Sequence, residues 1–154
     1  MFRGSSAART CGTVWFVLAA GLMAAPAAGA NPVAAVRVMN GSAAFELAYA
    51  ASASALGGYV TSDNTPLATI PRQATDAFTI ASTSAKALAG ELIYRAVNDP
   101  ARECTFRYTL AYAGGRFVLT ADARASWTGQ AACTATASVP DKAKGDFSVT
   151  FTMK

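Results

Sequence analysis

Histidine is absent from this chain of 154 residues, cysteine occurs three times, and charged residues make up only 14% of the composition. A chain without histidine has no imidazole base, which excludes Ser-His-Asp and Cys-His catalytic groups and every zinc site that contains histidine. No run of lysine or arginine stands out, whereas a nucleic-acid surface needs a dense basic patch. The sequence therefore predicts no nucleic-acid partner, no metal site and no cofactor.

A hydrophobic run long enough for a membrane-spanning helix is also missing. The longest apolar stretch, Thr13–Ala25, is about a dozen residues, whereas a spanning helix needs roughly 20. Two arginines precede this stretch and small residues around Ala30 follow it, which is typical of a secretory signal peptide. We therefore expect a signal peptide over residues 1–30, cleaved near Ala30, and a single secreted or periplasmic domain over residues 31–154. Two arginines leave with the signal, so eleven basic residues then face nine acidic ones and the net charge falls from +4 to +2.

Two cysteines remain after this cleavage, because Cys11 lies within the signal peptide. In an oxidising compartment the simplest fate of Cys104 and Cys133 is to pair with each other. Such a disulfide would stabilise the fold by about 3–4 kcal/mol in the chain-entropy model. A reactive thiol or a metal ligand is the less favoured alternative, because the chain offers no partner base and no nitrogen ligand.

Apolar and polar residues alternate with a period of two along much of the mature chain, which is typical of half-buried strands. The alternation is most regular over 146–153. Two further strands are predicted between Cys104 and Cys133, folded into a hairpin at Ala113-Gly114-Gly115. The tight-turn dipeptide Asn40-Gly41 predicts another hairpin over 33–50.

No segment of the mature chain shows a convincing helical pattern. The segment between Pro66 and Pro71 is expected at a sheet edge or in a connection, because proline cannot donate a ladder hydrogen bond. About eight short strands separated by turns predict an all-β fold, an antiparallel β-sandwich with one disulfide.

Acid–base chemistry by paired carboxylates is the remaining catalytic possibility, as in glycoside hydrolysis. The available side chains are Glu46, Glu91, Asp99, Glu103 and Asp122. Glu46 and Glu91 alternate with apolar neighbours, as solvent-facing strand residues do, and no spacing selects a pair. We therefore expect structural roles for these carboxylates and no enzymatic activity.

Aromatic and basic residues near the predicted turns form a candidate ligand surface. Its members are Tyr59, Tyr112, Trp127, Arg107, Arg116 and Arg124. The aromatic rings would stack on sugars or lie at a lipid headgroup boundary, and the arginines would bind an anion. The alternative interpretation is that Tyr112 and Trp127 cap the ends of the core and that the arginines protect a sheet edge.

The order of several segments resembles the aegerolysin-type β-sandwich over about residues 33–120. The resemblance is carried by Val36–Ser42, Leu56-Gly-Gly-Tyr59, Pro66–Pro71, the strand around Phe78, Gly90–Tyr94 and the Tyr108–Gly115 hairpin. It implies a small secreted protein that recognises membrane lipids, in some members together with a pore-forming partner, and it supplies no lipid-contacting residue for this chain. The other open hypothesis is an envelope-associated structural module or one that binds a polysaccharide or a protein.

Overall fold

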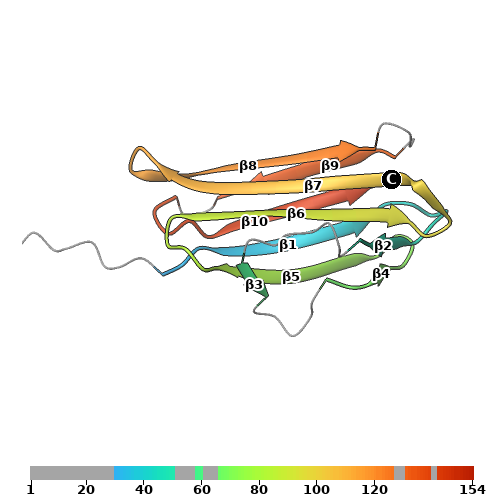
Figure 1. Cartoon of the computed structure of the whole chain (residues 1–154), viewed down its shortest axis with the longest axis horizontal. Helices are drawn as coiled ribbons and strands as arrows, with labels where there is room; N and C mark the ends of the chain where they lie inside the picture. Colours follow the sequence, from blue (N-terminus) through green and yellow to red (C-terminus); the bar gives the residue numbers. More distant parts are fainter. Residues whose placement is uncertain (1–29, 51–57, 61–65, 127–130, 140–141) are drawn as a thin grey trace, which may run out of the picture.

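The computed structural model describes residues 30–50, 58–60, 66–126, 131–139 and 142–154, with the backbone alone at Tyr59 and Val60. The strands form two five-stranded sheets that pack face to face (Figure 1). Sheet A has the order β3 (Gly58–Val60), β5 (Thr75–Ser82), β1 (Val33–Asn40), β10 (Phe147–Met153) and β9 (Cys133–Ser138). Sheet B has the order β4 (Thr69–Ile70), β2 (Leu47–Tyr49), β6 (Ala87–Ala96), β7 (Asp99–Ala113) and β8 (Arg116–Ala125).

The predicted all-β sandwich is confirmed, with ten strands in the described ranges and one parallel pair, β1 with β10. The alternation predicted for the last strand is also confirmed, since its apolar residues point inward and are buried. Phe151 stacks on Phe106 of sheet B with 4.8 Å between ring centroids, and Phe147 meets Tyr108 at 5.9 Å. These aromatic pairs join the two sheets across the core.

The hairpin predicted over 33–50 is wrong, because β1 lies in sheet A whereas β2 lies in sheet B. The Asn40 side chain explains the difference. It is buried, and its amide donates hydrogen bonds to the carbonyl oxygens of Phe45 at 2.8 Å and Pro71 at 3.0 Å. Gly41 continues away from β1 and donates its N–H to the Met153 carbonyl at 2.8 Å. The dipeptide therefore carries the chain from one sheet to the other. The short β4, between the two prolines, lies at a sheet edge as predicted.

The hairpin between the cysteines is confirmed as β7 and β8, which turn at Gly114-Gly115 with φ angles of +59° and +81°. Glycine adopts this left-handed backbone without a steric penalty. The predicted disulfide is also present, with 5.8 Å between the Cα atoms of Cys104 and Cys133. Because Cys104 lies in β7 and Cys133 begins β9, the disulfide joins sheet B to sheet A.

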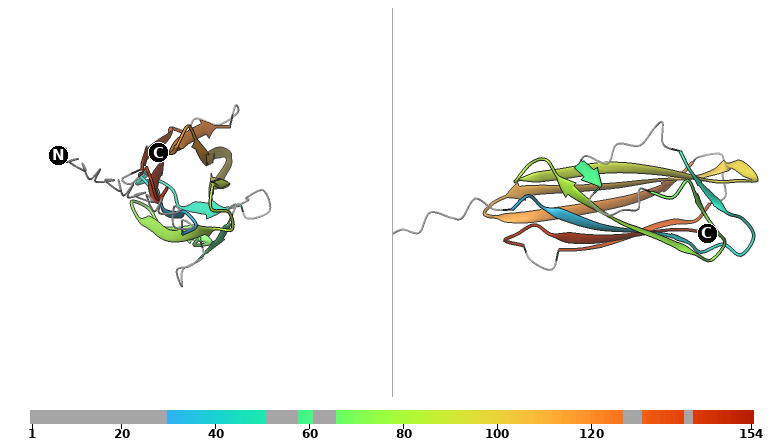
Figure 2. Two further views of the ribbon diagram at one scale, coloured as in Figure 1. Left: turned by 90° about the vertical axis from the view of Figure 1, so that its left-hand side faces the viewer. Right: turned by 90° about the horizontal axis from the view of Figure 1, so that it is seen from below.

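The sandwich thus has two distinct ends. The hairpin-tip end holds the Gly114-Gly115 turn and the loop over 142–146, since the Phe117 N–H donates to the Lys142 carbonyl oxygen at 3.0 Å. The disulfide end holds Cys104, Cys133 and the last residues of β8. Viewed along the long axis, the edge strands β8 and β9 close one side of the sandwich (Figure 2).

Candidate functional site

Three exposed basic residues lie at the hairpin-tip end, each from a different segment of the chain. Lys86 precedes β6, and its carbonyl oxygen accepts a hydrogen bond of 2.9 Å from the Tyr112 N–H at the end of β7. Arg116 begins β8, and Lys142 lies on the loop whose carbonyl binds the backbone of the next residue, Phe117. The strand pairing therefore brings together cations that are separated by tens of residues in the sequence.

Within the described residues, no carboxylate forms an ion pair with Lys86, Arg116 or Lys142. Asp146 lies at this end and accepts a hydrogen bond of 3.0 Å from the Val33 N–H. Asp141 lies outside the described residues. The hairpin-tip end consequently carries a local excess of positive charge.

Tyr112 gives this basic end an exposed aromatic side chain. Its residue is 45% exposed, and its ring meets the buried ring of Phe117 edge-on with 5.1 Å between centroids. Gly145 crosses the other side of Phe117 with φ at +80°, and a Cβ there would lie 2.7 Å from the ring. Glycine is therefore required where the loop packs on Phe117, which holds Tyr112 and the loop in fixed relation.

A hollow of about 290 Å³ opens beside this cluster, between β8 and β9. Its lining residues are Arg116, Phe117, Val118, Leu119, Ala137, Val139 and Lys142. Five of these seven residues are apolar, but most of the surface that lines the hollow is polar, and both charged side chains among them are cationic. The charge of the lining favours an anionic ligand over a cationic one.

The structure separates Arg116 from the other two arginines of the predicted ligand surface, whereas Arg107 and Arg124 are diagonal neighbours across β7 and β8. Arg107 forms an ion pair with Glu91 across β6 and β7, and Arg124 pairs with Asp122 at 2.6 Å. Their charges are balanced on the outer face of sheet B. Arg116 lies at the other end of β8, six residues from Asp122, which corresponds to roughly 20 Å along an extended strand.

The aromatic members of that surface are separated as well. Tyr112 lies at the hairpin-tip end, and the Tyr59 backbone pairs with Ala81 at the edge of sheet A. Trp127 lies outside the described residues, and its flanking residue Ser126 is at the disulfide end. Among the side chains that the structure describes, Tyr112 is the one exposed aromatic, so the described surface presents no flat row of rings.

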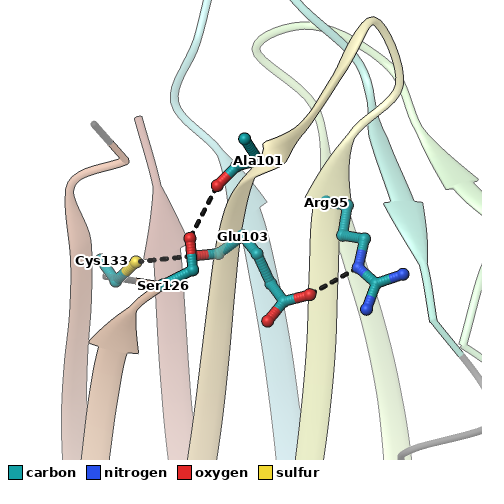
Figure 3. Close-up of polar contacts among 5 residues, drawn as sticks. All are labelled: Arg95, Ala101, Glu103, Ser126 and Cys133. Atoms are coloured by element: carbon teal, nitrogen blue, oxygen red, sulfur yellow. Dashed lines mark hydrogen bonds and ion pairs between the residues drawn. The ribbon is translucent and has the colours of Figure 1, made fainter. Parts of the chain in front are cut away.

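Contacts at the disulfide end are structural (Figure 3). Glu103 accepts a hydrogen bond from Arg95 Nε at 2.5 Å, and its carbonyl oxygen accepts one from the Ser126 N–H at 2.9 Å. Ser126 Oγ also donates to the Ala101 carbonyl at 2.6 Å. Cys133 is oxidised and has no S–H proton, so the 3.9 Å approach of its Sγ to the Glu103 carbonyl is a packing contact.

The candidate catalytic carboxylates are dispersed. Four of the five form an ion pair with an arginine: Asp99 with Arg102 at 3.2 Å, Glu103 with Arg95, Glu91 with Arg107, and Asp122 with Arg124. The fifth, Glu46, is exposed. A search of the described residues finds no group of three or more potential metal ligands. In the same ranges no helix is long and apolar enough to cross a membrane.

Buried polar groups in the core serve packing. Burial raises the pKa of Tyr94 and of Tyr108 far above the ordinary tyrosine value. Nearby Asp76 and Tyr49 raise the pKa of Tyr94 further by a smaller amount. Tyr49 has the same smaller effect on the pKa of Tyr108. Both hydroxyls therefore stay protonated at physiological pH. Asp76 is itself buried on the inner face of β5, where its carboxylate accepts the Leu67 N–H at 2.8 Å.

Lys86, Lys142 and the hollow were not among the site features predicted from the sequence. Lys86 and Lys142 stand far apart in the sequence, in segments without a motif. Their convergence follows from the sheet topology, which local patterns do not reveal. Asp76 did carry a signal, because it shares the alternation of Phe78 and Ile80.

Comparison with known proteins establishes a shared fold. No family model and no curated protein matches the sequence. The crystal structure of the lipid binding protein Nakanori aligns over 81% of this chain and 72% of its own, with a TM-score of 0.50 and 14% identity. The structure of RahU protein in complex with a Tris molecule aligns over 79% of this chain and 93% of its own, with a TM-score of 0.49 and 11% identity. Neither is named as an aegerolysin, so that resemblance stays a prediction.

Proposed function

We propose that this protein is a secreted, non-catalytic binding protein that docks on anionic lipid surfaces through its hairpin-tip end. The observation that carries the proposal is the convergence of Lys86, Arg116 and Lys142 around the exposed Tyr112. A basic residue near an anionic membrane contributes about 1 kcal/mol of binding free energy. An exposed tyrosine suits the headgroup boundary, because its ring is apolar and its hydroxyl is polar.

Two further observations support a lipid partner. The fold is shared with a lipid binding protein, Nakanori, and the order of segments resembles the aegerolysin type. The polysaccharide alternative receives less support, since the described surface has a single exposed aromatic ring. The ion-paired carboxylates favour binding over catalysis.

Vesicle co-sedimentation tests the proposal. The oxidised protein should pellet with phosphatidylcholine vesicles that contain phosphatidylserine and remain in solution with phosphatidylcholine alone. The double variant Lys86→Glu, Arg116→Glu removes two cations from the tip, so we expect a loss of at least about 2 kcal/mol, or roughly 30-fold in affinity.

A matched control changes the net charge equally elsewhere. Arg37 lies on the outer face of sheet A and Arg72 lies in the loop before β5, and both are exposed. The variant Arg37→Glu, Arg72→Glu should retain most of the binding. Equal losses in the two variants would show that net charge alone attracts the protein, and unchanged binding in the tip variant would overturn the proposal.

A further inference from the structure

The hollow beside β8 and β9 lies between the free edges of the two sheets. These strands are edge strands of sheets B and A, they lie side by side, and over their described residues they share no hydrogen-bonded ladder. The disulfide holds β9 to sheet B at one end of the sandwich, and the hollow opens toward the other end. An unpaired strand edge is a template for pairing with another extended chain.

The backbone of β8 turns half of its hydrogen-bonding groups toward this edge. The Phe117 N–H points away from β7, because it donates to the Lys142 carbonyl oxygen at 3.0 Å. In an antiparallel strand the N–H and C=O of one residue point to the same side, and alternate residues point to opposite sides. The backbone groups of Leu119 and Ala121 therefore also point to the free edge, where their N–H groups have no hydrogen-bond partner among the described residues.

The backbone of β9 forms the other side of the gap. Ala132, directly before the strand, and Lys154 exchange both backbone hydrogen bonds, each at 2.9 Å. The even-numbered residues of β9 therefore face β10, and the backbone groups of Ala135 and Ala137 point to the free edge of sheet A. Within the described part of the chain, neither of these two N–H groups has a hydrogen-bond partner.

The lining of the hollow agrees with this arrangement. Most of its surface is polar, although five of its seven residues have apolar side chains. Those five residues carry no polar atoms except backbone N–H and C=O groups. The polar surface therefore consists of strand backbone together with the two cationic side chains, Arg116 and Lys142, which are both exposed.

From this geometry we infer that the hollow binds a short extended peptide segment of another protein, which adds as a strand between the tip ends of β8 and β9. An extended backbone directs hydrogen-bonding groups to both of its sides, so it can pair with Leu119 on one side and Ala137 on the other. A strand of a folded sheet has at most one free edge, so a second copy of this sandwich cannot pair with both strands.

The charge of the lining restricts the sequence of this peptide. Arg116 and Lys142 come from β8 and from the loop over 142–146, and neither has an ion-pair partner among the described residues. Each cation favours an acidic side chain of its own on the bound segment. The inference goes beyond the proposed lipid docking and does not rest on it, because backbone pairing requires no membrane.

Fluorescence anisotropy of a labelled hexapeptide amide, Glu-Thr-Val-Thr-Val-Glu, tests the site in the oxidised protein without vesicles. Saturable binding of one peptide per chain is expected. Methylation of both threonine backbone nitrogens removes the donors along one side of the peptide and leaves its charge unchanged, so it should weaken binding by about tenfold or more. Equal affinity for the methylated peptide would overturn the inference, because charge alone would then attract the peptide. Absence of saturable binding would overturn it as well.

Protein variants locate the peptide. Ala137→Pro removes an N–H that faces the hollow but no ladder hydrogen bond, so it should weaken binding by about tenfold. Its control is Ala125→Pro, which removes a free-edge N–H of β8 near the disulfide end and should bind like the wild type. Wild-type affinity in folded Ala137→Pro would overturn the assignment.

Charge reversal keeps the test decisive if Ala137→Pro fails to fold. Arg116→Glu with Lys142→Glu should weaken the acidic peptide and should favour the peptide in which lysine replaces both glutamates. An unchanged preference for the acidic peptide in this surface variant would overturn the inference.

Amide hydrogen exchange reads the pairing directly. Bound peptide should slow exchange at Leu119 and Ala137 and leave Val118 unchanged, because the Val118 N–H already belongs to the ladder with β7. Unchanged exchange at Leu119 and Ala137 under saturating peptide would overturn the inference. Analytical ultracentrifugation supplies the remaining outcome: self-association without peptide binding would overturn it in favour of a second copy of this chain.

Discussion

Asn40 decides the path of the chain at the point where it leaves the first strand. Its side-chain amide donates to the carbonyl oxygens of Phe45, Pro71 and, at 3.3 Å, Ile70, while its Oδ1 accepts the Ser42 N–H at 3.0 Å. The residue is 2% exposed. One buried side chain thus satisfies backbone groups from two crossing segments, which water cannot reach.

Asn40→Ala should destabilise the fold by about 2–4 kcal/mol, because it leaves several buried backbone groups without partners at a cost of about 1–3 kcal/mol each, partly relieved by relaxation. Urea unfolding followed by tryptophan or tyrosine fluorescence measures the change. Asn31→Ala is the matched control. Asn31 is exposed and its amide donates one hydrogen bond of 2.9 Å, to the Ser82 carbonyl, so its loss should cost below about 1.5 kcal/mol. Similar midpoints for Asn40→Ala and the wild type would contradict the role assigned to this side chain.

At the scale of elements, the disulfide joins β7 of one sheet to β9 of the other, and the two cysteines have a sequence separation of 29. The edges of β8 and β9 have no ladder to hold them, so the covalent link supplies the tie at this end. The ion pair and hydrogen bond at Glu103 lie within sheet B, where they join β7 to β6 and to the end of β8.

The variant Cys104→Ala, Cys133→Ala should lose about 3–4 kcal/mol of stability, the value expected for a loop of this length. Urea unfolding with and without a reductant provides the test. The reductant should destabilise the wild type and have no further effect on the double variant. A loss below about 1 kcal/mol would indicate that the packing of β8 against β9 holds the edges together without the covalent bond.

The strands were predictable from the sequence where one face of a sheet is buried and the other face is exposed to solvent. Phe147, Phe151 and Met153 alternate with hydroxyl residues in β10, and the Gly114-Gly115 turn marks the hairpin, so both were predicted correctly. The disulfide was predictable from the cysteine count together with the expectation of an oxidising compartment. The prediction from Asn40-Gly41 was wrong because the same dipeptide occurs in tight hairpin turns and in crossings between sheets. Here the long-range hydrogen bonds to the carbonyl oxygens of Pro71 and Met153 favour the crossing.

The candidate site was predictable only in part. Tyr112 and Arg116 stand beside a recognisable turn, so both were among the predicted residues. Lys86 joins them because β6 pairs with β7 in a register that places Ala87 opposite Ala111. Arg107 and Arg124 were grouped with Arg116 by proximity in sequence, whereas the length of β8 places Arg116 at its other end, and Glu91 and Asp122 form ion pairs with Arg107 and Arg124. Sequence spacing therefore indicates the elements but not which of their ends meet.

At the scale of the whole molecule, positive charge is distributed unevenly along the sandwich. Ion pairs balance Arg95, Arg107 and Arg124 along the outer face of sheet B. The hairpin-tip end holds Lys86, Arg116 and the lysines of the loop over 142–146. Asp146 is the carboxylate that the structure describes at this end. This excess of basic residues gives the hairpin-tip end a local positive field, which would orient the molecule end-on toward an anionic surface.

This orientation makes vesicle binding sensitive to salt in a way that depends on the tip. The Debye length falls from about 8 Å at 0.15 M to about 3 Å at 1 M, so attraction between exposed cations and lipid charges is largely screened at the higher concentration. Pelleting of the wild type with phosphatidylserine-containing vesicles should therefore fall steeply across this range. Lys86→Glu, Arg116→Glu should pellet weakly at every salt concentration, and Arg37→Glu, Arg72→Glu should follow the wild-type curve. Wild-type pelleting that persists at 1 M salt would instead indicate that apolar contacts at Tyr112 dominate, because burial of apolar surface is not weakened by screening.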